Sequence, residues 1–415
     1  MRVTCFAEHA ERGSGPPHSA VLAANAAVQL GCQVDLILHR VRGSLLKQLS
    51  SEVNVIPLNG EPSFSTLRCM RDAGGGADLV FSTLLRTVFR RDPAKWVYWS
   101  LSALHGYLQS SQPRVLIAFG MKAGALNGML ARLRPSPSSV HVSAMSMQPS
   151  VWMRQRRKSK SVPVYHYRAC DLIFGCSEGV SRDTERILDL PPSSVPTLFE
   201  PVFEQPDKPV GSPGHPWLAE GVPGQRDRPV IVSAGKLIAR KDPAALLRAF
   251  AQLHRQQPAR LVIFGQGPLR DSLLALARSL RVERNVDLPG EYPDLIREFS
   301  GADLFAFASR GEGLGKVKVE ALAAGLPVVS TDCPSGPREI LQDGRFGTLV
   351  QVGDVQALAG AMAAELGGGR SAAEQRTRAR AFSSIEFTQH LLALALQHTG
   401  MNPPCLAAGA TEFIQ

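Results

Sequence analysis

Two glutamates on either side of a glycine-rich turn are the part of the sequence best suited to chemistry. Glu312 and Glu320 lie eight residues apart, and Gly313, Leu314 and Gly315 follow the first of them. Glycines let backbone N–H groups approach a ligand closely, and the N-terminus of a helix favours a phosphate or a polar sugar edge. We expect Glu320 about two turns into the following helix, where its carboxylate can accept hydrogen bonds from a ribose diol. Glu312, before that helix, could bind sugar hydroxyls, although paired glutamates also occur at helix starts that bind nothing.

A cluster of cations follows the first strand of the second half of the chain. Lys236, Arg240 and Lys241 come within seven residues of Gly235. The carboxyl end of a parallel strand is where such sheets bind a diphosphate. Preorganised Lys and Arg side chains can stabilise the negative charge of a leaving nucleoside diphosphate without a metal. The alternative is a solvated loop with no ligand.

Two further loops are placed where a ligand could touch them. Gly265 and Gly267 form a turn between a strand and a helix, but without a third glycine the turn is not the dinucleotide fingerprint. In the first half, Gly15 and His18 belong to the loop between the first strand and the first helix. No HExxH, P-loop or Ser-His-Asp order stands out, so we expect neither a metal nor a cofactor.

Strand-like apolar runs alternate with helix-length segments along most of the chain, which is the rhythm of βαβ units and predicts parallel sheets covered by helices on both faces. Proline and glycine dominate residues 200–228, as in a linker. We therefore predict an α/β protein with two doubly wound, Rossmann-like domains facing across a cleft. The expected boundaries are 1–199 for the first domain, 200–228 for the linker, 229–369 for the second domain and 370–415 for a tail. The apolar tail helix, Phe387–Gln397, is expected to cross back to the first domain.

The charge of +10 is unevenly spread. Residues 1–200 carry 23 Lys and Arg against 14 Asp and Glu, whereas residues 201–415 carry 23 against 22. Part of the excess is the basic run Arg154–Lys160, which could attract a polyanion, an anionic membrane surface or a phosphorylated acceptor, or could be a solvated surface. No apolar stretch reaches the ~18–20 residues that span a bilayer. Together with seven cysteines that form no CxxC pair, this predicts a cytoplasmic protein with reduced thiols.

These motifs together resemble those of the family-4 retaining glycosyltransferases of the GT-B fold, most closely from about Pro229 to Leu366. The family's Glu-x7-Glu motif maps onto Glu312 and Glu320, and its diphosphate clamp is similar to Gly235, Lys236 and Lys241. The phrase Thr331–Glu339 is similar to bacterial enzymes that build surface polysaccharides and lipid-linked glycans.

The resemblance implies a metal-independent, retaining transfer from a nucleotide-sugar donor, most commonly a UDP-sugar, to a glycan or lipid-linked acceptor. The first domain would then be the acceptor side, near Gly15 and His18, and the second the donor side. Peripheral contact with the inner face of the membrane would fit this reading, and nucleic acid is not an expected partner. Two alternatives stay open. One is another GT-B enzyme, such as a nucleotide-sugar epimerase or a phosphorylase. The other is a non-catalytic GT-B protein that binds a nucleotide sugar or a partner transferase, which the unusual Gly-Ser-Gly-Pro-Pro-His start of the first helix would favour.

Overall fold

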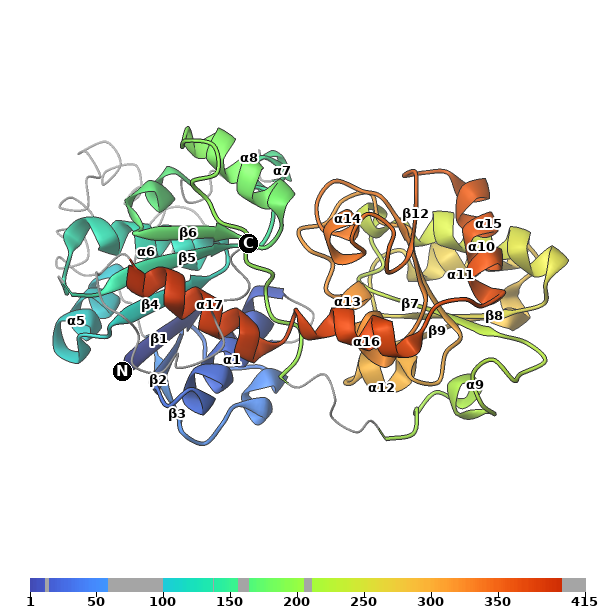
Figure 1. Cartoon of the computed structure of the whole chain (residues 1–415), viewed down its shortest axis with the longest axis horizontal. Helices are drawn as coiled ribbons and strands as arrows, with labels where there is room; N and C mark the ends of the chain where they lie inside the picture. The colour runs from blue at the N-terminus through green and yellow to red at the C-terminus, as the bar shows by residue number, and fades with distance from the viewer. Residues whose placement is uncertain (12–14, 59–99, 137, 156–163, 205–210, 398–415) are drawn as a thin grey trace. The chain divides into compact units, whose positions relative to one another are not determined.

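The computed structural model describes residues 1–11, 15–58, 100–136, 138–155, 164–204 and 211–397. The chain folds into two units (Figure 1), one of residues 1–204 with the segment from Ser384 onward and the other of Gln205–Ser383. Each unit contains a six-stranded, all-parallel sheet among the described residues. The predicted fold class, an α/β protein with two Rossmann-like domains, is confirmed.

The sheet of the first unit has the strand order β3-β2-β1-β4-β5-β6. Its strands are β1 Arg2–Ala7, β2 Gln33–Leu38, β3 Val53–Pro57, β4 Val115–Phe119, β5 Val140–Met145 and β6 Leu172–Gly175. Its helices are α1 Gly15–Gln29, α5 Leu101–Ser111, α6 Met121–Leu133, α7 Pro149–Gln155, α8 Glu178–Leu188 and α17 Ser384–Gln397, with the 3₁₀ turns η1 Ser44–Gln48 and η2 Val164–Ala169. The strands β4 and β5 are buried along their whole length, as expected of a parallel sheet with helices on both faces.

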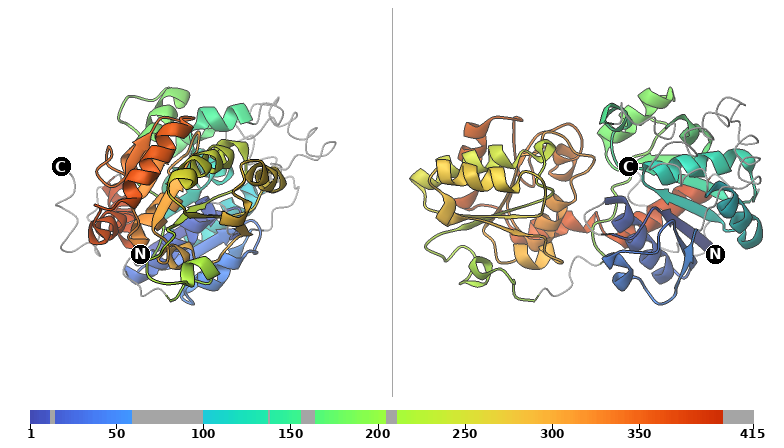
Figure 2. Two further views of the ribbon diagram at one scale, coloured as in Figure 1. Left: turned by 90° about the vertical axis from the view of Figure 1, so that its right-hand side faces the viewer. Right: turned by 180° about the vertical axis from the view of Figure 1, so that it is seen from behind.

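The sheet of the second unit has the strand order β12-β11-β10-β7-β8-β9. Its strands are β7 Val230–Ala234, β8 Arg260–Phe264, β9 Val286–Gly290, β10 Leu304–Phe307, β11 Val328–Thr331 and β12 Thr348–Val350. Its helices are α9 Pro216–Ala219, α10 Pro243–Gln256, α11 Arg270–Ser279, α12 Leu295–Phe299, α13 Val317–Ala324, α14 Pro337–Ile340, α15 Val355–Leu366 and α16 Ala372–Arg380, with the 3₁₀ turns η3 Ala239–Lys241 and η4 Glu283–Asn285. Seen from two further sides, helices lie on both faces of each sheet (Figure 2).

The last described helix, α17, packs in the first unit although it follows the second unit in sequence (Figure 1). Phe387 lies in the hydrophobic core that the sheet shares with α1, and its ring centroid is 6.4 Å from that of Phe119 and 5.7 Å from that of Phe174. At its start, the backbone N–H of Ser384 donates to the carbonyl of Phe203. The first unit is therefore built from both ends of the described chain.

Some predicted features fall on residues that the structure does not describe. These are the apolar run Asp78–Ser82, which the sequence predicts to be a strand, two of the seven cysteines, Cys69 and Cys405, and most of the basic run, residues 156–160. The described cysteines, residues 5, 32, 170, 176 and 333, are all free thiols. Within the described ranges, no helix combines the length and the apolar character that crossing a bilayer requires.

Candidate functional site

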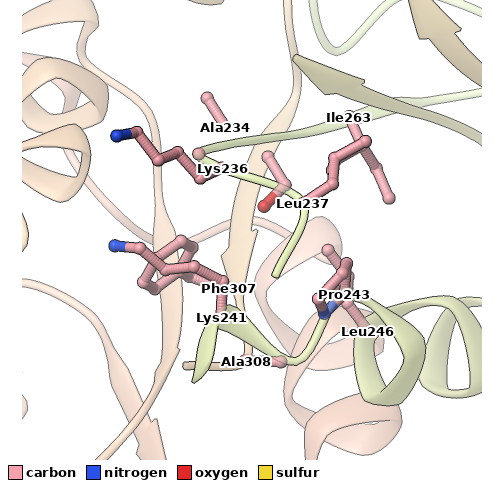
Figure 3. Close-up of a pocket in the computed structure, with 11 residues that line it drawn as sticks. Ala234, Lys236, Leu237, Lys241, Pro243, Leu246, Ile263, Phe307 and Ala308 are labelled. Atoms are coloured by element: carbon pink, nitrogen blue, oxygen red, sulfur yellow. The ribbon is translucent and has the colours of Figure 1, made fainter. Parts of the chain in front are cut away.

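A pocket opens in the second unit where β7 and β10 end. It is lined by Ser233, Ala234, Gly235, Lys236, Leu237, Lys241, Pro243, Leu246, Ile263, Phe307 and Ala308. In the close-up of Figure 3, the side chains of Lys236 and Lys241 extend toward the same side, and the ring of Phe307 lies beside Lys241. The Lys241 ammonium is 5.1 Å from the centroid of that ring. The pocket thus combines an apolar floor with two cations at the carboxyl edge of the sheet, the place that the sequence indicates for a diphosphate.

Two glycine turns meet beside this pocket. The backbone N–H of Gly235 donates to the carbonyl of Phe264, and that of Leu237 donates to the carbonyl of Gln266. Gly265 has a φ of +126°, and a Cβ built there would lie 2.1 Å from the Gly235 carbonyl oxygen. Gly267 is equally confined, since its Cβ would lie 2.5 Å from the Leu237 carbonyl oxygen. The structure therefore brings the predicted residues Gly235, Gly265 and Gly267 into one packed double turn.

The loop after β7 and the loop after β10 are joined through Arg240. Its carbonyl accepts from the backbone N–H of Arg310, and its Nη1 donates to the Gly311 carbonyl at 2.5 Å. Asp242 strengthens the junction, because it caps α10 by accepting from the Ala245 N–H and also accepts from Arg310 Nε at 2.7 Å. These contacts place Lys241, on the first loop, against Glu312, on the second.

Lys241 and Glu312 form a close, largely buried ion pair. The Lys241 Nζ donates to both carboxylate oxygens of Glu312, at 2.7 and 2.8 Å, and Arg240 Nη1 lies 3.5 Å from one of them. The Glu312 side chain is only 5% exposed and that of Lys241 16%. Burial on its own would raise the pKa of Glu312, but the charges of Lys241 and Lys318, together with hydrogen bonds from Lys241 and Ser309, more than offset it, so the pKa lies below its ordinary value of 4.5. Glu312 is thus held as a carboxylate.

Glu320 lies nearer the start of its helix than predicted. The sequence predicts it about two turns into the helix, and this prediction is wrong: α13 begins at Val317, so Glu320 is in the first turn. Gly315, with a φ of +87°, keeps the preceding segment out of the helix. Glu320 is partly exposed, and its backbone N–H donates to the Lys316 carbonyl. Its carboxylate at a helix N-terminus is favoured by the helix dipole.

The turn between the two glutamates is packed rather than open. Leu314 is 4% exposed, so its side chain belongs to the interior and only its backbone is available to a ligand. The Leu314 carbonyl lies against Gly336, where an added Cβ would be 2.0 Å from the carbonyl oxygen. Gly313 and Gly315 are partly exposed. The predicted set Gly313, Leu314 and Gly315 therefore lies in a packed turn, with the leucine side chain buried and the two glycines partly exposed.

Lys318 belongs to this site and was missed by the sequence analysis. It is fully buried in α13, and its Nζ lies 4.5 Å from the centroid of the Phe307 ring that Lys241 also touches. A Cβ built on Gly315 would be 2.2 Å from this Nζ. The signal available in the sequence is a lysine inside the apolar segment Val317–Ala324, where a solvated cation is not expected.

The residues predicted for the acceptor side lie in the first unit. Gly15 is exposed at the start of α1 and His18 is half-buried one turn along. The hydroxyl of Ser19 donates to the carboxylate of Glu200 at 2.5 Å and also lies 3.1 Å from the Gly15 carbonyl oxygen, and Ser146 donates to the same carboxylate. Glu200 is buried. Its contacts connect the segment just before Glu204 to the start of α1. Across both units, the described part of the chain contains no group of three His, Cys, Asp or Glu side chains that could hold a metal ion.

Comparison with known proteins adds a family for part of the chain. Residues 221–382 match the family described as glycosyl transferases group 1. The chain is 36% identical over 166 residues, which are 39% of this chain and 45% of the relative, to the N-acetylgalactosamine-N,N'-diacetylbacillosaminyl-diphospho-undecaprenol 4-alpha-N-acetylgalactosaminyltransferase of Campylobacter jejuni. It is 37% identical over 162 residues, 36% of this chain and 42% of the relative, to the GDP-mannose-dependent alpha-(1-6)-phosphatidylinositol monomannoside mannosyltransferase of Mycolicibacterium smegmatis. The matches span less than half the length of these relatives.

Solved structures match nearly the whole chain at low identity. The apo form of the lipopolysaccharide outer core galactosyltransferase WaaB is similar with a TM-score of 0.64 and 15% identity, covering 96% of this chain and 100% of that one. Anabaena HepE in complex with UDP is similar with a TM-score of 0.66 and 15% identity, again over 96% and 100%. These likenesses confirm that the chain has the predicted GT-B fold.

Proposed function

We propose, from the premise that residues 221–382 form a glycosyl transferases group 1 domain in a chain of GT-B fold, that the protein is a retaining glycosyltransferase. It moves a sugar from a nucleotide-diphosphate sugar, with UDP-sugars as the first class to test, to a glycan or lipid-linked acceptor. The observation that carries the proposal is the Lys241–Glu312 ion pair beside the pocket lined by Lys236.

The donor diphosphate binds at the two cations of the pocket. Lys236 is exposed and Lys241 partly buried, and both extend toward the same side of the pocket (Figure 3). When the glycosidic bond to the donor breaks, negative charge builds up on the leaving diphosphate, and fixed ammonium groups stabilise that charge. The double turn of Gly235, Gly265 and Gly267 lets the nucleotide lie against the backbone.

The two glutamates take different parts of the donor. Glu312, ionised and held by Lys241, binds the hydroxyls of the donor sugar, and Glu320 accepts hydrogen bonds from the ribose diol. Binding of the diphosphate draws Lys241 partly away from Glu312, which frees acceptor capacity on the carboxylate. The sugar and the diphosphate are thus bound by members of one ion pair. We propose that transfer proceeds with retention and without a metal.

The acceptor class is proposed from the relatives together with the charge of the chain. By their names, the two curated relatives described above act on a diphospho-undecaprenol and on a phosphatidylinositol mannoside, both of which are lipid-linked. The first 200 residues of this chain carry the basic excess, 23 Lys and Arg against 14 Asp and Glu. A basic surface binds anionic headgroups. We therefore propose peripheral contact with an anionic membrane, with the acceptor bound near Gly15 and His18.

The test is a donor screen with released nucleoside diphosphate as the readout. UDP-, GDP- and ADP-sugars are offered to the protein, to Glu312→Gln and to Glu374→Gln, a matched change of an exposed glutamate on α16. Release from one donor that Glu312→Gln lowers by about 100-fold and Glu374→Gln preserves would support the proposal. No release from any donor, together with no calorimetric binding of any of the three nucleotides, would overturn it and favour the non-catalytic reading.

A further inference from the structure

Lys318 is a buried cation without a hydrogen-bond partner. Its residue exposure is 0%, and within the described residues its Nζ makes no hydrogen bond. A charged group removed from water costs several kcal/mol unless partners replace the lost hydration. The helix around it offers none, because Val319 and Ala321 are buried and apolar. A methionine of similar length would fill this position at less cost, so the ammonium calls for an explanation beyond packing.

The ammonium of Lys318 borders the pocket through one aromatic ring. Its Nζ is 4.5 Å from the centroid of Phe307, and the Lys241 Nζ is 5.1 Å from the same centroid. Phe307 lines the pocket together with Lys236 and Lys241. Attraction to the ring face offsets part of the desolvation of a cation but provides no hydrogen bonds. Two ammonium groups thus line the pocket, and a third, that of Lys318, is buried against the ring of a residue that lines it.

The same ammonium lies directly against the glycine turn. The Cβ that any other residue would place at Gly315 would be 2.2 Å from Lys318 Nζ. The φ of +87° at Gly315 also favours glycine. Glycine at this position therefore does two things: it allows the turn, and it leaves room for the ammonium beside its own backbone.

The local charge is unbalanced toward the positive. The groups whose charge acts on Lys318 are Glu312, Cys333, Lys241 and Arg240. Of these, only Glu312 is a carboxylate, and both of its oxygens already accept from Lys241. Burial lowers the pKa of Lys318, and the negative charge of Glu312 only partly opposes this. A bound anion would supply the missing negative charge.

We propose that Lys318 is a further donor-binding residue, whose ammonium group binds the diphosphate of a nucleoside diphosphate together with Lys236 and Lys241. The proposal rests on the proposed function and adds a residue to its donor site. A purely structural role would instead have the ammonium held only by the Phe307 ring and the field of Glu312.

The experiment measures nucleotide binding by isothermal titration calorimetry in the full chain. UDP, GDP and ADP are titrated into the wild type. The nucleoside diphosphate that binds, and the monophosphate of the same nucleoside, are then titrated into the variants. The variants are Lys318→Met and, as a matched control, Lys47→Met, which removes an exposed lysine of the first unit. If Lys318 makes a charge-assisted contact to the diphosphate, Lys318→Met should lower the affinity for the nucleoside diphosphate by about 10-fold or more. The affinity for the nucleoside monophosphate should fall less, and Lys47→Met should change neither affinity.

Thermal unfolding separates binding from folding. Loss of an unpartnered buried charge should leave the melting temperature of Lys318→Met equal to or above that of the wild type. If this variant does not fold, Lys318→Gln takes its place in the same titrations.

The outcomes separate this inference from the proposed function. The role of Lys318 would be disproved if the wild type binds the nucleoside diphosphate and Lys318→Met binds it with an affinity within twofold of the wild type. It would also be disproved if the variant lost equal affinity for the diphosphate and the monophosphate. In both cases the proposed function would remain. If the wild type bound none of the three nucleotides, the donor site itself would be disproved, and Lys318 with it.

Discussion

The ammonium nitrogen of Lys241 lies 2.7 Å from one carboxylate oxygen of Glu312 and 2.8 Å from the other. The ammonium that would bind the donor diphosphate is hydrogen-bonded to the carboxylate that would bind the donor sugar. When the donor binds, these hydrogen bonds must therefore be exchanged for hydrogen bonds to the ligand. Opposite charges that compete in this way couple nucleotide affinity to the state of the glutamate.

Glu312→Gln should separate turnover from nucleotide affinity. The isosteric amide removes the negative charge that holds Lys241, and we expect glycosyl transfer to fall by about 100-fold while the nucleoside diphosphate binds as tightly as before or a few-fold tighter. Steady-state release of the diphosphate and calorimetric titration measure the two effects. A variant that binds the diphosphate more weakly would contradict the competition described here.

The same pair should show strong energetic coupling in stability. Lys241→Met leaves the Glu312 carboxylate buried and short of its main partner, which costs about 3–5 kcal/mol in comparable pairs. In the double variant Lys241→Met/Glu312→Gln, much of this cost should be recovered, with a coupling energy of about 1–3 kcal/mol. Native-state hydrogen exchange of β7 and β10 amides reports the free energy of unfolding of the second unit. Additive losses would mean that the two groups do not depend on each other.

The lowered pKa of Glu312 predicts an acid-sensitive contribution to stability. Because the pKa is lower in the folded protein than its ordinary value of 4.5, the contribution is complete above that value and is lost as the pH falls through the folded pKa. Urea unfolding of the wild type and Glu312→Gln, compared across acidic pH, should show a stability difference that shrinks as the pH falls. A difference that widened toward acid would show that the carboxylate is not stabilised in the folded state.

Gly265→Ala should disrupt the double turn beside the pocket. The methyl group would meet the Gly235 carbonyl at 2.1 Å, at a φ of +126° that alanine rarely adopts, and we expect a loss of about 3 kcal/mol or more. The control is Gly360→Ala, at an exposed position of α15 where nothing lies within 4 Å of the added atom. That change should stabilise the helix by about 0.5–1 kcal/mol. Hydrogen exchange of β8 and α15 amides distinguishes the two effects, and equal responses would refute the steric argument.

Phe387→Ala should weaken the first unit and leave nucleotide binding intact. The ring is 4% exposed and packs against Phe119 and Phe174, and truncating a buried phenylalanine costs about 3–5 kcal/mol. Gln397→Ala, at an exposed position of the same helix, should cost little. Hydrogen exchange of β4 amides and titration with a nucleoside diphosphate measure the two properties. Unchanged protection of β4 in Phe387→Ala would show that α17 contributes little to this core.

Regular elements were well predicted by apolar periodicity, and the differences have local causes. The sequence predicts strands at Arg2–Ala7, Gln33–Leu38, Val53–Pro57, Val230–Ala234 and Arg260–Phe264, and β1, β2, β3, β7 and β8 have these bounds. The apolar periodicity of Ser19–Leu30 predicts a first helix that starts at Ser19. The helix begins at Gly15 instead, because proline in the first turn of a helix loses no hydrogen bond. The tail helix begins at Ser384 rather than Phe387, where the periodicity becomes visible.

The part of the candidate site that could be predicted consists of charged residues next to glycines at the ends of strands. Lys236, Lys241, Gly235 and Glu312 were identified because cations, carboxylates and glycines at strand ends indicate ligands. The direct contact of Lys241 with Glu312 was not, since it depends on the packing of two loops 71 residues apart. Lys318 was not predicted for a different reason. The burial of a single charged side chain depends on how the chain packs in three dimensions and produces no periodic pattern in the sequence.

The position of α17 has a consequence for the order in which the two units can fold during translation. Synthesis proceeds from the N-terminus, so the faces of the first sheet and α1 that meet Phe387 stay uncovered until the helix beginning at Ser384 has left the ribosome. The second unit, drawn from one unbroken stretch of chain, can be complete before that moment. The unit whose synthesis begins first is therefore the unit whose core is completed last.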